Sequence, residues 1–458
     1  METKSAFFTK DKEFYHTLFR MLLIVSLQNI VAYTVNMADN MMLGRYSQDA
    51  MSGAATVNQI YFIVQQMALA IGEALVMLTS QYWGQKRLEP IRKLTGTALY
   101  LGVIFGVIVF AICAFAPEQV VGIFTDDGAI IAQGVEYLRI TKYSYILFVI
   151  TSVLMSSLRS VETVNISFVI SCVSLIVNVA INYALIFGKF GCPELGVVGA
   201  AVGTLVARAI ELAIVVFYML VIDKKLKLFS TNFLKLDKDL TKDYRKVAIP
   251  VILSQLLWAV SVPFQTAILG HLSADAIAAN SVATTFYSYL KVIVQSMSAV
   301  SAVLIGRTIG RGNMEEIKAD ARTLQVADIA IGIVLGVVLF LLRNPLLSFY
   351  SLTDSAMTLA AQLLVVMAFI MVGMSYQMPV SMGIIRGGGD ARFTLIMNTV
   401  STWAIVIPLS LMSAFWWKWP VVLVVIMIQS DQVFKCLPTA LRIRKYDKWI
   451  KKMTRENK

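Results

Sequence analysis

Residues 18–43 read LFRMLLIVSLQNIVAYTVNMADNMML, an apolar run with a single basic residue, Arg20, and a single acidic residue, Asp39. A helix of about 20 such residues crosses the roughly 30 Å hydrocarbon core of a bilayer. Similar runs recur along the chain, in which 58% of the 458 residues are hydrophobic and 15% are charged. This composition excludes an ordinary soluble domain and predicts an all-α integral membrane protein.

Twelve membrane-spanning helices can be placed from these runs, with ends defined to within about 4 residues. The predicted spans are 18–43, 56–80, 94–116, 133–158, 164–187, 195–221, 246–269, 277–305, 323–342, 357–385, 392–414 and 417–438.

The net charge of +12 is concentrated in alternate connecting segments. Lys and Arg gather at the N-terminus, after the second, sixth and eighth spans, and in the tail, whereas the intervening loops are acidic or nearly neutral. Because short basic loops stay in the cytoplasm, we predict cytoplasmic N and C termini in a multi-pass protein of the inner or plasma membrane. Topology explains the basic residues, so we do not expect nucleic acid as a partner.

The chain contains an internal duplication. Leu43–Ala54 reads LGRYSQDAMSGA and Leu269–Asn280 reads LGHLSADAIAAN, at an offset of 226 residues. The register persists, because Gly84 in the first half falls on Gly310 in the second at the same offset. The two halves are therefore copies of one another.

Each copy carries an even number of spans, so both have the same orientation and a symmetry axis along the membrane normal is expected. We predict two pseudo-symmetric six-helix lobes, 1–221 and 247–440, joined by a basic cytoplasmic linker at 222–246 and followed by a basic tail at 441–458. Such a pair favours transport by alternating access at the interface of the lobes; the alternative is a static duplicated channel.

Polar side chains recur on one face of the first span. The stripe consists of Asn29, Tyr33, Asn36 and Asn40, with Asp39 on its flank. A carboxylate at membrane depth costs several kcal/mol unless it is neutralised, paired or hydrated. Burial favours the neutral acid, so we predict that Asp39 exchanges a proton near neutral pH and couples transport to the ion gradient, with Asn36 and Asn40 beside it. The alternative is an aspartate at the membrane edge that reaches water beside Arg45.

The fifth span carries two amides one helical turn apart, Asn178 and Asn182. Amide side chains offer donors to a carboxylate or oxygens to a hard cation. We therefore include both residues in the coupling site and consider Na⁺ bound by Asp39, Asn178 and Asn182 as an alternative to H⁺. Hydrogen bonding between helices is the structural alternative.

Other ionisable residues inside the spans fall into two groups. Arg208 with Glu211, and Asp431 with Lys435, can neutralise each other within one helix, and we expect structural roles for both pairs. Glu73 has no such neighbour; we expect it to pair with Lys142 or Lys291 or to take part in coupling. The residues predicted to line a substrate site are Tyr33, Gln255, Gln265, Tyr376 and Gln377.

Four cysteines without paired spacing and two histidines, His16 and His271, predict neither a disulfide nor a metal cluster. We expect no cofactor. An integral membrane enzyme would need a nucleophile, an acid–base cluster or a metal site at a membrane face, so the sequence favours a transporter over an enzyme.

Several segments resemble the multidrug and toxin extrusion (MATE) transporters of the MOP flippase superfamily. The similarity is carried by Asp39–Arg45 (DNMMLGR), Gln81–Gly84 (QYWG), Phe115–Asp126 (FAPEQVVGIFTD), Asn178–Gly188 (NVAINYALIFG), Glu194–Thr204 (ELGVVGAAVGT) and Ile385–Arg392 (IRGGGDAR). The resemblance implies a secondary antiporter that exports small organic, often cationic, compounds in exchange for H⁺ or Na⁺. Asp39 matches the family's helix-one aspartate.

The sequence also departs from the family pattern. One branch has Asn followed by Asp on helix five, where this chain has Asn178 and Asn182, and the NorM-type branch has acids on helices seven and ten, near Gln255 and Gln377 here. Ile24 stands where the family commonly has a helix-one proline. These differences favour H⁺ over Na⁺ as the coupling ion, in a protein that we expect to be a monomer.

The alternative function is a flippase for a lipid-linked oligosaccharide or another amphipathic lipid. It would require a cationic cavity that grips a pyrophosphate. Lys142 and Lys291 are the main residues of the spans that could supply such charge.

Overall fold

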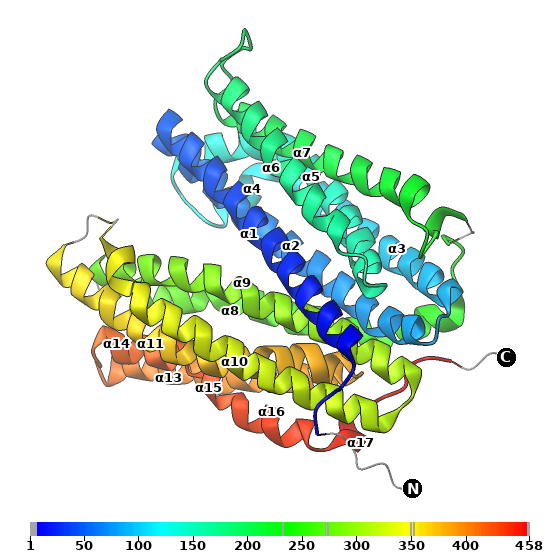
Figure 1. The fold of residues 1–458 in the computed structure, drawn as a ribbon. Coiled ribbons are helices and arrows are strands. Elements are labelled where there is room, and N and C mark those ends of the chain that lie inside the picture. The colour runs from blue at the N-terminus through cyan, green and yellow to red at the C-terminus, as the bar shows by residue number, and fades with distance from the viewer. Residues whose placement is uncertain are drawn as a thin grey trace, which may run out of the picture. The chain divides into compact units, whose positions relative to one another are not determined.

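The computed structural model describes residues 7–230, 233–270, 272, 274–348, 350 and 353–455, and all regular structure within these ranges is helical (Figure 1). His271 and the last three residues of the predicted tail lie outside the described residues.

The first half of the chain forms seven α-helices, a π-helical extension (η1) and a short 3₁₀ turn (η2). Their bounds are α1 Lys12–Tyr46, α2 Gln48–Gly84, α3 Leu88–Phe115, α4 Pro117–Gly122, α5 Gly128–Ser160, α6 Asn165–Ile186, α7 Val197–Phe217, η1 Tyr218–Ile222 and η2 Leu228–Ser230.

The second half contains ten α-helices and three π-helical stretches. Their bounds are α8 Lys238–Gly270, α9 Ala274–Arg311, α10 Met314–Leu347, α11 Asp354–Met378, η3 Pro379–Ile385, α12 Ala391–Thr399, η4 Val400–Val406, α13 Ile407–Leu411, η5 Met412–Trp416, α14 Val421–Gln429, α15 Asp431–Phe434, α16 Cys436–Ile443 and α17 Tyr446–Trp449.

Twelve helical segments of the described residues are long and apolar enough to cross a membrane, which confirms the predicted all-α architecture. Several helices extend beyond their apolar run. α8 begins at Lys238, so Lys242 and Arg245, which the sequence analysis assigned to a connecting segment, are helical. The apolar run marks the part of a helix that can lie in hydrocarbon, and the helix itself continues into polar surroundings.

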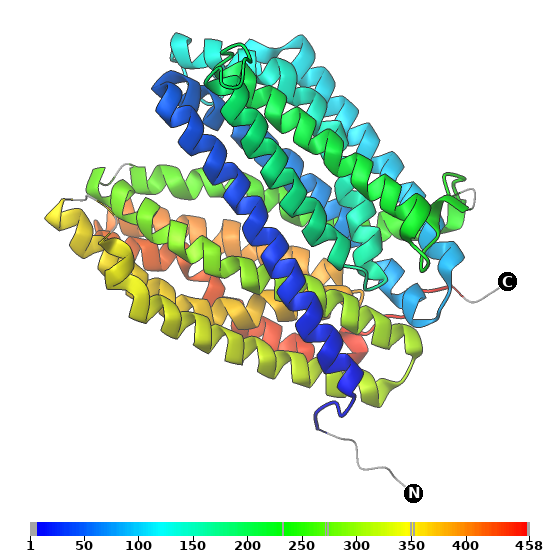
Figure 2. The ribbon, with the colours of Figure 1, turned by 45° about the horizontal axis from the view of Figure 1, so that its top comes forward.

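The described residues divide into two compact units. The N-terminal unit comprises 23–79 and 87–248, and the C-terminal unit comprises the described residues of 1–22, 80–86 and 249–458. In the N-terminal unit α7 packs against α5 and α6, and in the C-terminal unit α11 packs against α9 and α10. Figure 2 shows α1, in blue, as one continuous helix.

The ends of α2 and α9 cross closely within the C-terminal unit. A Cβ atom added at Gly84 would overlap the carbonyl oxygen of Arg307, and one added at Gly310 would overlap that of Gln81. The offset of 226 residues that relates Gly84 to Gly310 also relates Gln81 to Arg307. The two contacts are therefore copies of each other, which supports the internal duplication and gives a packing reason for both glycines.

We predict that Gly310→Ala lowers the free energy of unfolding by about 1–3 kcal/mol, because the methyl group forces two backbones apart. Chemical denaturation in detergent measures the change. Gly122→Ala is the matched control, since a Cβ at Gly122 meets nothing within 4 Å. Equal stability of the two variants would contradict the close crossing.

Asp237 starts α8. Its Oδ1 accepts hydrogen bonds from the backbone amides of Leu240 and Asp239, at 3.1 and 3.0 Å. Lys93 Nζ lies 3.7 Å from Oδ2. The Leu240 and Asp239 amides, with the Lys93 charge, lower the pKa of the Asp237 carboxyl below its usual range.

We predict that Asp237→Ala lowers the free energy of unfolding by about 1 kcal/mol near neutral pH, the usual contribution of a helix cap. Since the folded-state pKa is depressed, this stability is present above the ordinary aspartate pKa of about 4 and is lost as the pH falls through the folded value. Denaturation from about pH 7 to about pH 3 should show the wild type and the variant converging. Asp126→Ala, at an exposed loop position, should leave stability unchanged throughout.

Candidate coupling site

Asp39 lies on the buried side of α1. Its side chain is 9% exposed, and Val35 and Leu43, one turn before and after it, are buried as well. Of the predicted polar stripe, Tyr33 and Asn40 are exposed. Helical spacing places them on a different face from Asp39, so the stripe does not form the buried site as a whole.

α6 supplies the amides that meet Asp39. Asn182 Nδ2 donates to Asp39 Oδ1 at 2.6 Å and lies 3.3 Å from Asn178 Oδ1. Both asparagines are fully buried. The structure thus brings Asp39, Asn178 and Asn182 together, as their spacing predicted.

Gly203 on α7 makes room for this arrangement. A Cβ atom there would overlap Asn182 Oδ1. A larger residue would push the amide out of its position, so the absence of a side chain at this point of α7 fixes the donor that faces Asp39.

Arg208 on α7 is the cation closest to the site in chemical character, but Glu211 already neutralises it. Arg208 Nη1 lies 2.7 and 2.9 Å from the two carboxylate oxygens of Glu211. The guanidinium also lies over the rings of Tyr61 and Phe148, at 5.7 and 5.0 Å from their centroids. The predicted structural pair exists, and it lies beside Asp39 within electrostatic range.

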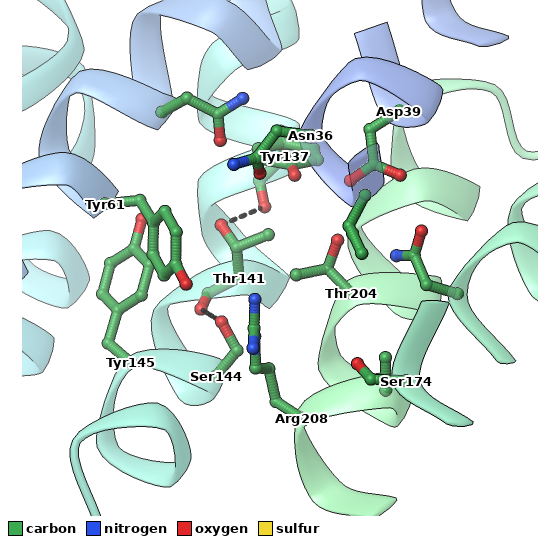
Figure 3. Close-up of a pocket in the computed structure, with 14 residues that line it drawn as sticks. Asn36, Asp39, Tyr61, Tyr137, Thr141, Ser144, Tyr145, Ser174, Thr204 and Arg208 are labelled. Atoms are coloured by element: carbon green, nitrogen blue, oxygen red, sulfur yellow. Dashed lines mark hydrogen bonds between the residues drawn. The ribbon is translucent and has the colours of Figure 1, made fainter. Parts of the chain in front are cut away.

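These residues enclose a small polar cavity. Figure 3 shows Asp39 and Arg208 on opposite sides of Thr204, with Tyr61 and Tyr145 forming another wall. The volume of about 20 Å³ accommodates little more than one water molecule. The lining residues are Val35, Asn36, Asp39, Asn58, Tyr61, Tyr137, Thr141, Ser144, Tyr145, Ser174, Asn178, Thr204, Ala207 and Arg208.

Three polar atoms around the cavity lack a hydrogen-bond partner within the described part of the chain: Thr204 Oγ1, Tyr145 Oη and Asn182 Oδ1. Buried polar atoms of this kind ordinarily bind ordered water. The arrangement is therefore chemically suited to a proton or a small hydrated occupant, and it is too small for an organic molecule of ordinary pocket volume.

A family model described as MatE matches residues 25–184 and 250–412, well over half of the chain and one segment in each of its duplicated halves. The chain belongs to the MatE family. It is a multi-pass membrane protein of a family of multidrug efflux transporters, which are not enzymes.

Similar proteins agree with this assignment. The "Probable multidrug resistance protein NorM" of Thermotoga maritima is 24% identical over 391 residues, covering 84% of this MatE chain and 82% of that protein. "Multidrug resistance protein MdtK" of Pectobacterium atrosepticum is 22% identical over 378 residues, covering 82% of each. The bent form of the Vibrio cholerae MATE transporter VcmN shares the fold, with a TM-score of 0.84, 17% identity and coverage of 94% and 97%.

The other predicted site residues of this MatE chain lie outside the cavity. Glu73 on α2 is half-buried and is not among the lining residues. Gln255 and Gln265 lie on α8, in the C-terminal unit.

Tyr376 and Gln377 are neighbours on α11 but make different contacts. Tyr376 Oη approaches Gln325 Oε1 at 3.4 Å and lines a separate, mostly apolar groove of about 600 Å³. Gln377 Nε2 donates to Gln432 Oε1 at 2.7 Å.

Sequence reasoning missed part of the site. The aromatic and hydroxyl residues Tyr61, Tyr137 and Thr204 carry no spacing signal, since each occurs singly on its helix. Asp328 on α10 was missed as well: it is fully buried, and both carboxylate oxygens lack a hydrogen-bond partner among the described residues. Its signal in the sequence was an acid in an apolar span with no basic residue one turn away.

We predict that Gly203→Ala and Asn182→Ala are strongly non-additive. Gly203→Ala alone should cost about 1–3 kcal/mol of unfolding free energy because its methyl group collides with the amide of Asn182. In the double variant that amide is absent, so most of the penalty should vanish. A double-mutant cycle by denaturation in detergent measures the coupling, and simple additivity would contradict the contact.

Proposed function

We propose that this chain is a secondary antiporter of the cell membrane that exports small organic compounds, cationic ones among them, in exchange for protons. Asp39 carries the proton. Membership of the MatE family and the names of its multidrug resistance relatives support export of organic compounds. The electrostatics around Asp39 support the proton.

The observation that carries the proposal is that Asp39 is buried beside an ion pair that is already complete. Arg208 is held by both oxygens of Glu211, so the charge of an ionised Asp39 is only partly offset. Burial favours the neutral acid, whereas the short hydrogen bond from Asn182 and the Arg208 charge favour the carboxylate. These opposed effects leave the two protonation states close in free energy, as a proton carrier requires.

The orientation of the amides favours H⁺ over Na⁺. A hard cation is bound by oxygen ligands, and Asp39 and Asn178 offer theirs, but Asn182 presents its nitrogen to both. Binding of Na⁺ by the three residues would require this amide to turn over and to lose its hydrogen bond to Asp39. A proton requires no such rearrangement.

Exchange follows from competition for the charge of Asp39. An organic cation binds best when Asp39 is ionised, and protonation removes that attraction, so each ligand promotes release of the other. The cavity of about 20 Å³ is far smaller than an organic ligand. Substrate binding therefore requires the helices around Asp39 to separate, and the form described here is the substrate-free one.

The test is efflux of a fluorescent organic cation from proteoliposomes under an imposed proton gradient or an imposed Na⁺ gradient. We expect proton-driven efflux by the wild type and loss of that efflux in Asp39→Asn, because the amide cannot release a proton. Asp126→Asn makes the same chemical change at an exposed position and should transport normally.

Each other outcome has a defined meaning. Efflux driven by Na⁺ alone would make Asp39 a metal ligand and overturn proton coupling. Proton-driven efflux that persists in Asp39→Asn would move the proton to another residue. A wild type that is inactive under both gradients would favour the flippase alternative.

A further inference from the structure

Lys291 on α9 is a cation of the membrane-spanning core of the C-terminal unit without an ion-pair partner. Its ammonium lies 5.4 Å from the centroid of the Trp258 ring. No salt bridge or hydrogen bond of the described residues involves its Nζ. A cation–π contact compensates a buried ammonium less well than a charge-assisted hydrogen bond does.

The carboxylate nearest in charge to Lys291 is already occupied. Asp431 lies within electrostatic range of Lys291, together with Lys435. Lys435 Nζ binds Asp431 Oδ2 at 2.7 Å, and Gln432 Nε2 donates to Asp431 Oδ1 at 2.8 Å. Two ammonium groups therefore share one carboxylate, and the group as a whole carries an excess positive charge.

A second donor lies one turn before Lys291 on the same face of α9. The hydroxyl of Tyr287 donates only to the sulfur of Met374, at 2.8 Å, and a thioether is a weak acceptor. Lys291 and Tyr287 thus both lack a strong acceptor. The oxygens of a carboxylate, sulfonate or phosphate would satisfy both, and Lys291 is only partly buried, so a ligand can reach it.

The two units have opposite polarity at related positions. At the offset of 227 residues, Arg208 corresponds to Lys435, and each forms an ion pair within its own helix. The additional charge differs. The N-terminal unit adds the acid Asp39, whose counterpart at an offset of 226 is the neutral Gln265, whereas the C-terminal unit adds the base Lys291.

We propose that Lys291, with Tyr287 and the face of Trp258, forms a binding site for the acidic group of an aromatic organic anion or zwitterion. The ammonium and the hydroxyl bind the anionic oxygens, and the indole packs against the ring system. The substrates of this exporter thus include compounds that carry an acidic group. The inference builds on the export of organic compounds proposed above.

The test is equilibrium dialysis of two dyes against the protein in nanodiscs, with empty nanodiscs subtracted. Fluorescein is an anion and rhodamine 123 a cation, and both have a xanthene ring system. Fluorescein should bind the wild type, and Lys291→Gln should weaken that binding roughly tenfold or more, the usual loss for a charge-assisted hydrogen bond. Rhodamine 123 should bind the variant at least as tightly as the wild type.

Two further variants sharpen the comparison. Lys291→Arg should retain fluorescein binding. Lys142→Gln is the matched control, because Lys142 Nζ likewise lies over aromatic rings, 5.6 Å from Phe110 and 5.5 Å from Tyr143, but belongs to the N-terminal unit; it should bind fluorescein as the wild type does. Fluorescein should also raise the unfolding temperature of the wild type and not that of Lys291→Gln.

Unchanged fluorescein affinity in Lys291→Gln, or no saturable fluorescein binding to the wild type, would overturn the proposal. Equal losses in Lys291→Gln and Lys142→Gln would also overturn it, since they would indicate a general effect of membrane charge. Binding in nanodiscs needs no ion gradient. A failure of proton-driven efflux therefore leaves this result intact, and the two proposals fail separately.

Discussion

The interior of a helical membrane protein cannot hold a bare charge cheaply, and this constraint decides where the ionisable groups of this chain lie. Two pairs, Arg208 with Glu211 and Lys435 with Asp431, neutralise themselves within one helix. They require nothing from the rest of the fold. The groups left over, Asp39 and Lys291, have no opposite charge of their own and therefore respond to what binds near them. A group whose charge depends on its ligand is what an exchanger needs, because protonation or ligand binding then changes the free energy of the surrounding helices.

Close helix packing makes these interactions specific. Where a helix carries glycine, a neighbouring polar group can approach its backbone without a side chain between them. Gly203 gives Asn182 its place in this way, and the amide in turn meets Asp39 at hydrogen-bond distance. Gly84 and Gly310 allow α2 and α9 to cross closely at their ends. The coupling chemistry thus depends on residues that have no chemistry of their own.

The sequence predicted the parts of this structure that are repeated or periodic. Twelve apolar runs were visible because each must cover the hydrocarbon thickness, and Asn178 and Asn182 were found because one helical turn separates them. Asp39 was identified as the lone acid of its span. The polar stripe on α1 misled, because polarity alone does not tell which face of a helix is buried: Asn40 is exposed, whereas the buried ridge runs through Val35, Asp39 and Leu43. Thr204 and Tyr61 could not be predicted, since their proximity to Asp39 arises from the packing of separate helices.

Comparison of the duplicated halves carries the argument one step further. Two copies of one template begin with the same residues at the same positions, so their differences record different demands on each copy. The second copy keeps Pro250 inside α8, whereas the first has Ile24 at the corresponding position of an α1 that is helical throughout (Figure 2). The second copy also replaces the acid Asp39 by Gln265 while adding the base Lys291. Charge has thus been removed and added in opposite senses. This divergence is expected if the N-terminal unit handles the proton and the C-terminal unit handles the charge of the ligand, and it is not expected of two copies that only fill the membrane.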